Sequence, residues 1–328
     1  MPSWTPGVAG PLDRTAPVYV AGHRGLVGSA IHSLLAAEGF ENIIVRSSAE
    51  VDLRDRGSVE SLFEQTRPEV VILAAAKVGG ILANDTRPVD FLSDNLRIQL
   101  NVMDAALQYG TERLLFLGSS CIYPKFAPQP ITEDSLLNGP LEPTNEAYAI
   151  AKIAGIKQVQ AVRRQYGKNW ISAMPTNLYG PRDNFSPTGS HVLPALIRRY
   201  EEAARNGAVS VTNWGSGSPR REFMHVEDMA RACLHLLENY DGPEHVNVGT
   251  GEDLSIRELA GLVADAVGYS GDVDWDTSKP DGTPQKLLDV SVLEATGFRP
   301  GISLAAGISS TVAWYRENIA DVRMAHHA

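Results

Sequence analysis

The middle of the chain gathers the side chains best suited to chemistry. Residues 114–117 form an apolar run that predicts a short buried strand, and Ser119 and Cys121 follow it. A later helical pattern spaces Tyr148 and Lys152 four residues apart, so the phenol and the ammonium share one helix face. A cation beside a phenol lowers the pKa of the phenol and makes it a usable acid or base. These groups around one carbonyl predict a site that moves hydride and protons.

Each of these features also has a purely structural explanation. A Tyr-x-x-x-Lys pair occurs by chance in many helices, and serines after a strand commonly form turns. A small buried hydrophobe explains Cys121, and a residue that caps a helix start explains His191. A dinucleotide-binding pattern upstream favours the chemical interpretation of Tyr148 and Lys152.

That pattern is a glycine-rich turn near the N-terminus. Residues 18–21 predict a strand, and Gly22, Gly25 and Gly28 follow in a Gly-x-x-Gly-x-x-Gly spacing. Helical periodicity begins by Ile31. A strand, a glycine turn and a helix let backbone N–H groups and the helix N-terminus approach a pyrophosphate. The sequence therefore predicts a bound dinucleotide.

The end of the next predicted strand, residues 43–45, indicates which dinucleotide binds. Arg46 stands where NAD-preferring folds commonly place an acidic residue for the ribose 2′-hydroxyl. Arg24, inside the glycine turn, adds a second positive charge. Two guanidiniums suit a 2′-phosphate, so NADP(H) is predicted; surface arginines without a ligand are the alternative. Asp52 and Leu53 follow and are expected beside the adenine.

Strands and helices alternate along the first half of the chain. Helices are expected over 59–65 and 89–109, with a buried strand over 70–73 between them and another strand over 170–174. Ala75 follows one strand and keeps the side chain small where the backbone meets the cofactor. The alternation predicts an α/β fold, a Rossmann-type doubly wound parallel sheet with a smaller C-terminal α/β substrate-binding region.

The predicted domains follow from this fold. They are a loose N-terminal tail over 1–17, an NADP-binding Rossmann domain over 18–180 to which about 222–250 returns, and a substrate-binding region over 181–221 and 251–320. Two helix starts have the spacing of a capping box, Ser255 with Glu258 and Ser291 with Glu294.

The composition excludes several classes of protein. The 328 residues are 43% hydrophobic and carry a net charge of −10, so nucleic acid and anionic membranes are not expected partners. The two cysteines, Cys121 and Cys233, form neither a disulfide framework nor a zinc spacing, which fits a cytoplasmic protein. No apolar run reaches membrane-spanning length, and residues 1–17 lack the pattern of a signal peptide.

Several stretches together point to a family. The glycine turn with Tyr-x-x-x-Lys resembles the extended short-chain dehydrogenase/reductases. The stretches GHRGLVGSAI, LLFLGSSCIYP, EPTNEAYAIAKIAGIK and SKPDGTP.KLLD resemble, more narrowly, the GDP-L-fucose synthase family. Matching motifs run from Val18 to about Asn318. The resemblance implies conversion of GDP-4-keto-6-deoxy-D-mannose to GDP-L-fucose, by 3,5-epimerisation and then NADPH-dependent reduction of the 4-keto group.

The resemblance also implies a role for each member of the site. Tyr148 would donate the proton in reduction, with Lys152 lowering its pKa and holding the nicotinamide ribose. Ser119 would bond to the 4-keto oxygen, while Cys121 and His191 would exchange protons at carbons 3 and 5. The implied cofactor contacts are Gly22, His23, Arg24, Gly25, Leu26, Val27, Gly28, Arg46, Lys152, Pro175, Thr176, Asn177, Leu178 and His191. The implied substrate contacts are Ser120, Asn177, Arg199, Trp214, Arg221, Lys279 and Asp281, and no metal is expected.

Two other functions compete with this interpretation. One is an NAD-dependent sugar-nucleotide 4-epimerase or dehydratase, which Arg46 and the Cys121 and His191 pair oppose. The other is a non-catalytic NADP-binding protein, which the retained Tyr148 opposes.

Ser48 departs from the family, since some relatives carry a second arginine there. The resemblance also implies a homodimer, through helices near 89–109 and 146–166.

Overall fold

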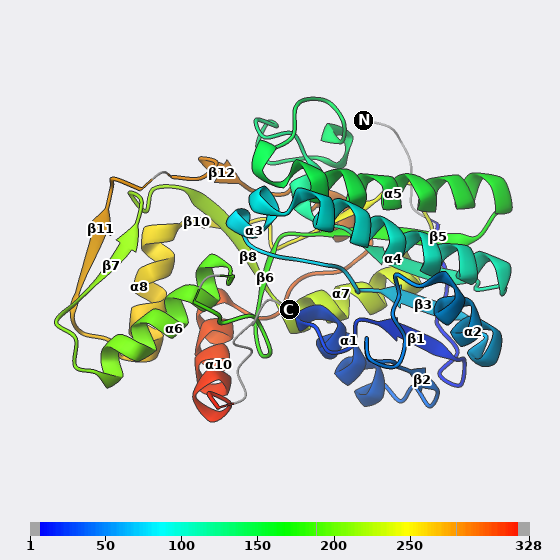
Figure 1. Cartoon of the computed structure of the whole chain (residues 1–328), viewed down its shortest axis with the longest axis horizontal. Coiled ribbons are helices and arrows are strands. Elements are labelled where there is room, and N and C mark those ends of the chain that lie inside the picture. Colours follow the sequence, from blue (N-terminus) through cyan, green and yellow to red (C-terminus); the bar gives the residue numbers. More distant parts are fainter. Residues whose placement is uncertain (1–6, 188, 280, 321–328) are drawn as a thin grey trace.

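A parallel sheet with helices on both faces forms the larger lobe of the molecule (Figure 1). The computed structural model describes residues 7–187, 189–279 and 281–320. Every neighbouring pair of strands in this sheet is parallel, and the order reverses between β1 and β3, so the predicted Rossmann-type doubly wound sheet is confirmed. From edge to edge its strands are β2 (Ile43–Ile44), β1 (Val18–Ala21), β3 (Val70–Leu73), β4 (Arg113–Leu117), β5 (Asn169–Pro175) and β9 (Val246–Val248).

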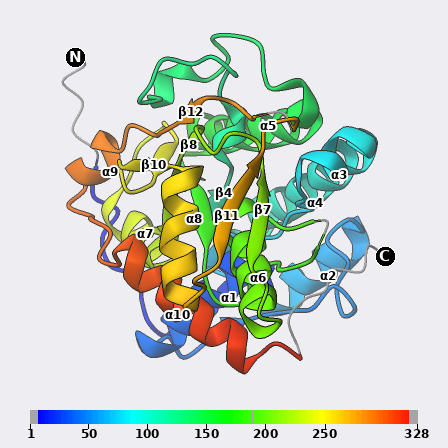
Figure 2. The same ribbon diagram turned by 90° about the vertical axis from the view of Figure 1, so that its left-hand side faces the viewer.

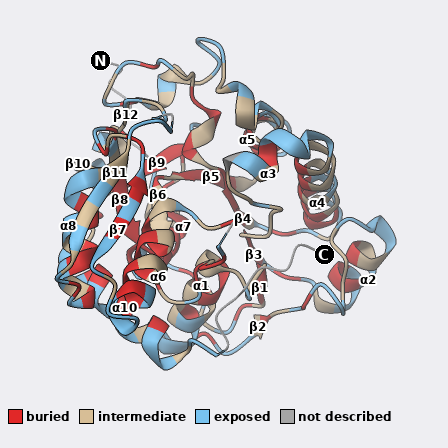
Figure 3. Ribbon diagram, turned by 60° about the vertical axis from the view of Figure 1, so that its left-hand side comes forward, coloured by how far each residue is buried: buried red, intermediate tan, exposed pale blue. Residues whose placement is uncertain are grey.

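Helices cover both faces of this sheet. Along β1, Val18 and Val20 enter the core beneath α1 and α7, whereas Tyr19 and Ala21 enter the core beneath α2, α4 and α5. Successive residues of a strand point to opposite faces, which explains why these strands are apolar throughout (Figure 3). The helices are α1 (Leu26–Ala37) and α7 (Val226–Asn239) on one face, and α2 (Arg56–Thr66), α4 (Pro88–Gln108) and α5 (Glu146–Tyr166) on the other.

A smaller lobe is built from the second half of the chain (Figure 2). Its core includes Tyr179, Ile197, Val263 and Ile308. One sheet pairs β8 (Arg220–His225) with β6 (Asn177–Tyr179), β10 (Asp253–Ser255) and β12 (Gln285–Lys286). A second pairs β7 (Ser210–Trp214) with β11 (Asp272–Asp276), and the lobe's helices are α6 (Val192–Arg205), α8 (Ile256–Val267) and α10 (Leu304–Glu317).

The N-terminal segment is more ordered than the sequence predicts. Gly7 forms an antiparallel bridge with Asp241, the Arg113 guanidinium donates hydrogen bonds to the carbonyls of Ala9 and Gly10, and Leu12 is buried. The prediction of a loose tail is therefore wrong for residues 7–17, because it took no account of partners that lie far along the chain. Residues 1–6 lie outside the described part.

Smaller differences concern single elements. A short helix, α3 (Ile81–Thr86), precedes α4 and was not predicted. The capping box at Ser255 is present, but α9 (Ser291–Ala295) begins differently, because the Ser291 N–H donates to the Asp289 carboxylate. Among the described helices, none combines the length and apolarity needed to cross a membrane.

Candidate active site

The turn after β4 presents the predicted hydroxyl and thiol. Ser119 precedes a short 3-10 helix, η1 (Ser120–Ile122), and its hydroxyl accepts a hydrogen bond from the Cys121 N–H at 3.4 Å. Ser120 is buried beneath the turn, while Cys121 is a free cysteine of intermediate exposure. We call residues 119–123 the active-site turn. It occupies the carboxyl end of β4, where ligands bind in open α/β sheets.

Lys152 is fixed against the same end of β4. It is 4% exposed, and its Nζ donates to the Leu117 carbonyl oxygen at 2.8 Å. Nζ also lies 4.8 Å from the ring centroid of Phe116 and 5.8 Å from that of Tyr148. Burial lowers the pKa of Lys152 to about 8, because an ammonium is costly to remove from water. The ammonium can therefore exchange its proton near neutral pH.

Tyr148 lies on α5 one turn before Lys152, but its pKa is raised, whereas the sequence predicts that it is lowered. Burial raises the pKa of Tyr148, and the neighbouring Cys121 adds to the increase. The predicted lowering by Lys152 is absent here, since desolvation of the phenol dominates and the ammonium is bonded to Leu117. A phenol that keeps its proton is suited to donate that proton to a substrate oxygen.

Cys121 lies among cationic groups. Burial raises the pKa of its thiol, and Lys286 opposes this increase most strongly, followed by the Ser119 hydrogen bond and Lys152. Burial in turn lowers the pKa of Lys286, and Cys121 opposes that change. The thiol and the amine therefore each favour the charged form of the other.

Lys286 was not singled out from the sequence. It lies in β12, which pairs in parallel with β8 and sets Lys286 opposite Arg221. The available signal was the Lys-Leu-Leu-Asp stretch over 286–289, which contributed to the family resemblance. Nothing in its spacing shows that Lys286 influences Cys121, because that influence depends on the folded arrangement of distant segments.

His191 lies at the start of α6. Its imidazole makes no N-cap hydrogen bond, so the capping explanation does not describe it. The residue as a whole is exposed to solvent. The protein around its imidazole nevertheless displaces water, and this desolvation lowers the pKa of the imidazole. Within the described residues, His191 is not among the groups that shift the pKa of Cys121. The structure thus brings Ser119, Cys121, Tyr148 and Lys152 together. In the part of the chain that it describes, it shows no hydrogen bond between His191 and any of them.

The glycine turn forms a tight passage between β1 and α1. Gly22 has a φ of +89°, and a Cβ on it would lie 2.8 Å from the Cα of Ala75. A Cβ on Gly28 would lie 2.2 Å from the Gly22 carbonyl oxygen. Gly25 is the N-cap of α1 and provides no side-chain cap. The backbone therefore stays close and the first N–H groups of α1 remain for an anion.

The two predicted phosphate-binding arginines share a neighbourhood. Arg46 and Arg24 both help lower the pKa of Glu50, whose carboxylate accepts hydrogen bonds from the Ser47 N–H and hydroxyl. Arg46 is exposed and donates to the Val45 carbonyl. Glu50 carries no motif in the sequence, yet its carboxylate interacts electrostatically with both guanidiniums.

The residues expected beside the adenine are held by other contacts. The Asp52 carboxylate forms an ion pair with Arg54 at 2.8 Å. The Leu53 carbonyl accepts a hydrogen bond from the Asn101 side chain. These contacts fix the segment that follows the phosphate-binding arginines.

The passage from β5 to β6 is tied to β8. The Thr176 hydroxyl and the Asn177 amide both donate to the Glu222 carbonyl, at 3.3 and 2.8 Å. Pro175 ends β5 and Leu178 continues β6. The four predicted residues 175–178 thus form one fixed connection between the lobes.

Except for Ser120 on the active-site turn, the predicted substrate contacts lie on the smaller lobe. Arg199 donates to Asn213 Oδ1 at 2.7 Å, beside the end of β7. Trp214 is 71% exposed, and Lys279 Nζ lies 5.9 Å from its ring centroid. Asp281 accepts hydrogen bonds from the Ser216 N–H and hydroxyl, while burial lowers the pKa of Arg221. This set combines an aromatic face with cations, which suits a nucleotide diphosphate.

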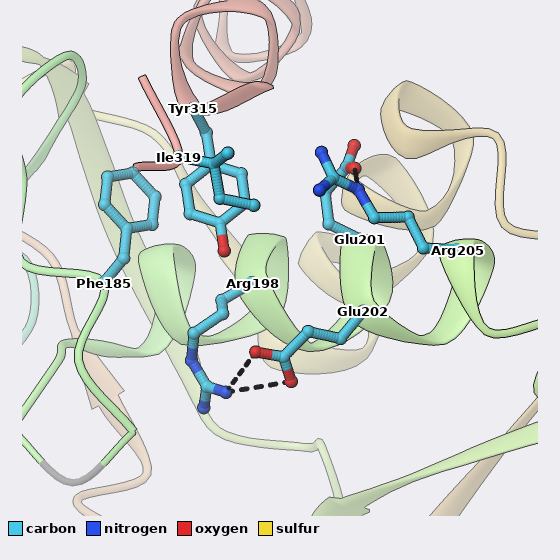
Figure 4. Close-up of a pocket in the computed structure, with 7 residues that line it drawn as sticks. All are labelled: Phe185, Arg198, Glu201, Glu202, Arg205, Tyr315 and Ile319. Carbon is cyan, nitrogen blue, oxygen red and sulfur yellow. Dashed lines mark hydrogen bonds and ion pairs between the residues drawn. The ribbon is translucent and has the colours of Figure 1, made fainter. Parts of the chain in front are cut away.

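A separate pocket lies between α6 and the C-terminal part of the smaller lobe (Figure 4). Arg198 points into it and donates to both carboxylate oxygens of Glu202, whereas the adjacent Arg199 is directed toward β7. The pocket contains none of the predicted site residues; its lining is Phe185, Arg198, Glu201, Glu202, Arg205, Tyr315 and Ile319.

Comparisons with known proteins identify the family. Residues 18–249 match the model of the NAD dependent epimerase/dehydratase family. GDP-L-fucose synthase 1 of Arabidopsis thaliana is 59% identical over 94% of this chain and 95% of its own length. The chain belongs to the GDP-L-fucose synthase family. Another member, GDP-L-fucose synthase of Escherichia coli (strain K12), is 53% identical over 92% of this chain and 97% of its own. A GDP-L-fucose synthetase from Naegleria fowleri, solved bound to NADP, is 31% identical with a TM-score of 0.91, covering 98% of this chain and 99% of that one.

The residues of this GDP-L-fucose synthase family member fit a dinucleotide. Side chains are excluded where Gly22 and Gly28 approach neighbouring backbone, and the α1 N-terminus has no side-chain cap. The buried Nδ1 of His23, in the same turn, makes no hydrogen bond within the described residues. Such a donor-rich cradle suits a pyrophosphate. In the described part of the chain, no cluster of three or more acidic, histidine or cysteine side chains is arranged to hold a metal ion.

Proposed function

We propose that the protein converts GDP-4-keto-6-deoxy-D-mannose to GDP-L-fucose, inverting carbons 3 and 5 and then reducing the 4-keto group with NADPH. One observation carries the proposal: Ser119, Cys121, Tyr148 and Lys152 converge at the carboxyl end of β4. Membership of the GDP-L-fucose synthase family supports the same conclusion.

The two inversions are proton exchanges. The 4-keto group acidifies the hydrogens on carbons 3 and 5, so removal of either gives an enolate whose charge rests on the 4-oxygen. Ser119 and Tyr148 donate hydrogen bonds to that oxygen. Cys121 and His191 remove a proton from one face and return a proton to the other, so no atom is gained or lost. Lys286 favours the thiolate of Cys121, which makes removal of the carbon-bound proton easier.

The reduction then uses Tyr148 and Lys152. NADPH, when bound, supplies the hydride for carbon 4. Tyr148 transfers its phenolic proton to the 4-oxygen, for which its raised pKa suits it. Lys152 stabilises the phenolate that is left and, with a pKa of about 8, can return a proton to it. Neither step requires the thiol of Cys121.

The binding residues follow from the placements described above. The glycine turn over 22–28 would hold the pyrophosphate, Arg24 and Arg46 the 2′-phosphate, and residues 175–178 the nicotinamide end. Trp214, Arg199 and Arg221 would hold the GDP-sugar, with Lys279 and Asp281 closing the nucleotide end. The exposed indole of Trp214 offers a face for the guanine.

The proposed assembly is a homodimer in the cytoplasm. The helices α4 and α5 pack against each other and carry outward-facing apolar residues, among them Val89, Leu100 and Ile150. Pairing these surfaces between two copies would cover them. The free thiol of Cys121 must stay reduced to move protons, which suits a reducing compartment.

One experiment tests the proposal. The protein is incubated with GDP-4-keto-6-deoxy-D-mannose and NADPH in heavy water, and the product is identified by NMR. We expect stoichiometric NADPH oxidation and GDP-L-fucose deuterated at carbons 3 and 5. Cys121→Ser, which replaces the thiol by a much weaker acid, should still reduce the ketone slowly but give an unepimerised GDP-6-deoxyhexose. A product formed without net NADPH consumption would instead indicate a 4-epimerase.

A further inference from the structure

The active-site turn ends in a side chain that leaves the site. Tyr123 is 3% exposed, and its hydroxyl reaches β9, the edge strand that the second half of the chain adds to the large sheet. There it bonds to Asn247 Oδ1 and lies 2.9 Å from His245 Nε2. The buried phenol of Tyr123 therefore connects the turn that carries Cys121 to β9 through a hydrogen bond.

The hydrogen bonds around this phenol have one consistent orientation. Asn247 Nδ2 donates to the carbonyls of Ile131 and Asp289, at 2.9 and 3.1 Å, which directs the amide oxygen toward Tyr123. An amide oxygen only accepts, so Tyr123 must donate to it. His245 must then donate to the phenol through Nε2. Burial lowers the pKa of His245 to about 4, so the imidazole is neutral and a single tautomer satisfies the network.

The same amide holds the segment that carries Lys286. This segment follows β12 and lies beside residue 131: the Ile131 N–H donates to the Leu287 carbonyl at 2.8 Å, and the Asp289 N–H donates to the Ile131 carbonyl at 2.9 Å. Asn247 bonds to two carbonyls of this junction, those of Ile131 and Asp289. Its buried side chain thus joins the active-site turn to the Lys286 segment.

The reduction centre is held by other contacts. Lys152 is fixed by the Leu117 carbonyl, and Tyr148 lies on the same helix, so both are positioned by β4 and α5 without Asn247. Cys121 and Lys286, in contrast, come from a turn and a short strand that are linked through Tyr123, Asn247 and the Ile131 junction. Proton transfer from carbon is sensitive to the placement of the base, and errors near an ångström cost up to about a hundredfold in rate.

We propose that Asn247 is a positioning residue for the epimerisation. Through Tyr123 on one side and Asp289 on the other, it fixes the positions of Cys121 and Lys286 relative to each other. This inference rests on the proposed function, in which Cys121 moves protons at the sugar. It predicts that breaking the network slows proton exchange at carbons 3 and 5 far more than hydride transfer.

Two reactions separate these steps. Proton exchange is measured as deuterium uptake by GDP-4-keto-6-deoxy-D-mannose in heavy water without reduction, using NADP+ in place of NADPH. Hydride transfer is measured in reverse, as single-turnover oxidation of GDP-L-fucose by NADP+, which requires no inversion. The variants are Tyr123→Phe, Asn247→Leu and the double variant. Thr111→Val is the matched control, because its buried hydroxyl donates to the Pro68 carbonyl at the opposite end of the sheet.

We expect Tyr123→Phe to slow deuterium uptake about tenfold and Asn247→Leu to slow it somewhat more, with GDP-L-fucose oxidation within about twofold of wild type. The double variant should resemble Asn247→Leu, because both changes break one network. Thr111→Val should leave the ratio of the two rates unchanged. If Asn247→Leu does not fold, Tyr123→Phe, which keeps the ring, still decides.

Two results would overturn the proposal. One is an equal loss of both reactions, which indicates general destabilisation; the other is wild-type deuterium uptake by Tyr123→Phe. Cys121→Ser is assayed in parallel to separate this from the proposed function. If Cys121→Ser loses uptake and Tyr123→Phe does not, only the role of Asn247 fails. If Cys121→Ser keeps uptake, the role of Cys121 fails and the positioning role fails with it.

Discussion

The two ends of the site are built in opposite ways. At the chemical end, Lys152 is buried and bonded to the main chain of β4, and Ser120 is buried beneath the active-site turn. At the proposed nucleotide end, Trp214 is 71% exposed, and Asp281 is exposed as well. One end is shaped before any ligand arrives, whereas the other offers groups on the surface of the smaller lobe.

This difference follows from what each end must do. Burial is the main cause of the shifted pKa values of Tyr148, Lys152 and Cys121, so the chemical end depends on exclusion of water. A nucleotide must enter and leave, which an exposed aromatic face and loop-borne cations permit. Changes at the chemical end should therefore reduce kcat, and changes at the nucleotide end should mainly raise KM.

The largest effect is expected at the chemical end. Tyr148→Phe removes the proposed proton donor and keeps the ring, so single-turnover NADPH oxidation should fall by about a hundredfold or more. NADPH affinity, followed by fluorescence titration, should change little, since no part of the glycine turn is altered. Near-normal NADPH oxidation by this variant would remove Tyr148 from the mechanism.

A smaller effect is expected at the proposed 2′-phosphate site, where Arg46 is exposed. Arg46→Ala should weaken NADPH binding by about ten- to a hundredfold, which corresponds to roughly 1.5–3 kcal/mol for a charge-assisted hydrogen bond. NADH lacks the 2′-phosphate and should bind as it does to wild type. Ser48→Arg is the matching gain-of-charge variant and should increase the preference for NADPH. Equal weakening of both cofactors by Arg46→Ala would show that the arginine does not read the phosphate.

The nucleotide end should respond through KM. Trp214→Ala removes the proposed stacking surface, and loss of a base–aromatic contact of roughly 1–3 kcal/mol should raise the KM for the GDP-sugar by about tenfold. The kcat should stay within about twofold, because Trp214 is exposed and none of the hydrogen bonds that hold the buried groups involves it. Steady-state kinetics at saturating NADPH measure both constants. A fall in kcat without a change in KM would abolish the distinction between the two ends.

The smallest effect concerns stability behind the active-site turn. Burial raises the pKa of Glu133 from its usual 4.5 to about 7, and its carboxyl accepts the Asn247 N–H. The folded state therefore binds this proton more tightly, and the stabilisation is present below about pH 4.5 and lost as the pH rises through about 7.

Glu133→Gln should remove this dependence. Compared with wild type, its urea midpoint should be relatively lower at pH 4.5 and relatively higher at pH 8. The exposed neighbour provides the control variant, Asp134→Asn. A constant difference between wild type and Glu133→Gln from pH 4.5 to 8 would mean that Glu133 does not titrate in this window.

The sequence predicts the parts of this structure that depend on local pattern. The strands around β1, β3 and β4, the glycine turn and the Tyr148–Lys152 helix each carry a period or spacing that identifies them. The capping box at Ser255 is correct for the same reason. Ser291 and Glu294 have the same spacing, yet they form no capping box. The Asp289 carboxylate accepts the Ser291 N–H at the start of that helix instead, which the spacing does not reveal.

The sequence did not predict what depends on distant segments. Lys286 and Asn247 carry no motif of their own, and they reach the site because β12 and β9 join sheets formed largely by other parts of the chain. The pKa of Tyr148 was expected to fall because only the neighbouring cation is visible in the sequence. The dominant cause, burial, is a property of the folded core.

The position of Lys286 also has a consequence for synthesis of the protein. A growing chain that ends before β12 already contains Tyr148, Lys152 and the whole glycine turn, but it lacks Lys286, the amine that most favours the Cys121 thiolate. Nor can the junction at Ile131 form until residues 287–289 have left the ribosome. Because domains tend to fold as their residues emerge, the cofactor half can form first. Lys286 becomes a neighbour of the Cys121 thiol only after the cofactor half has been synthesised.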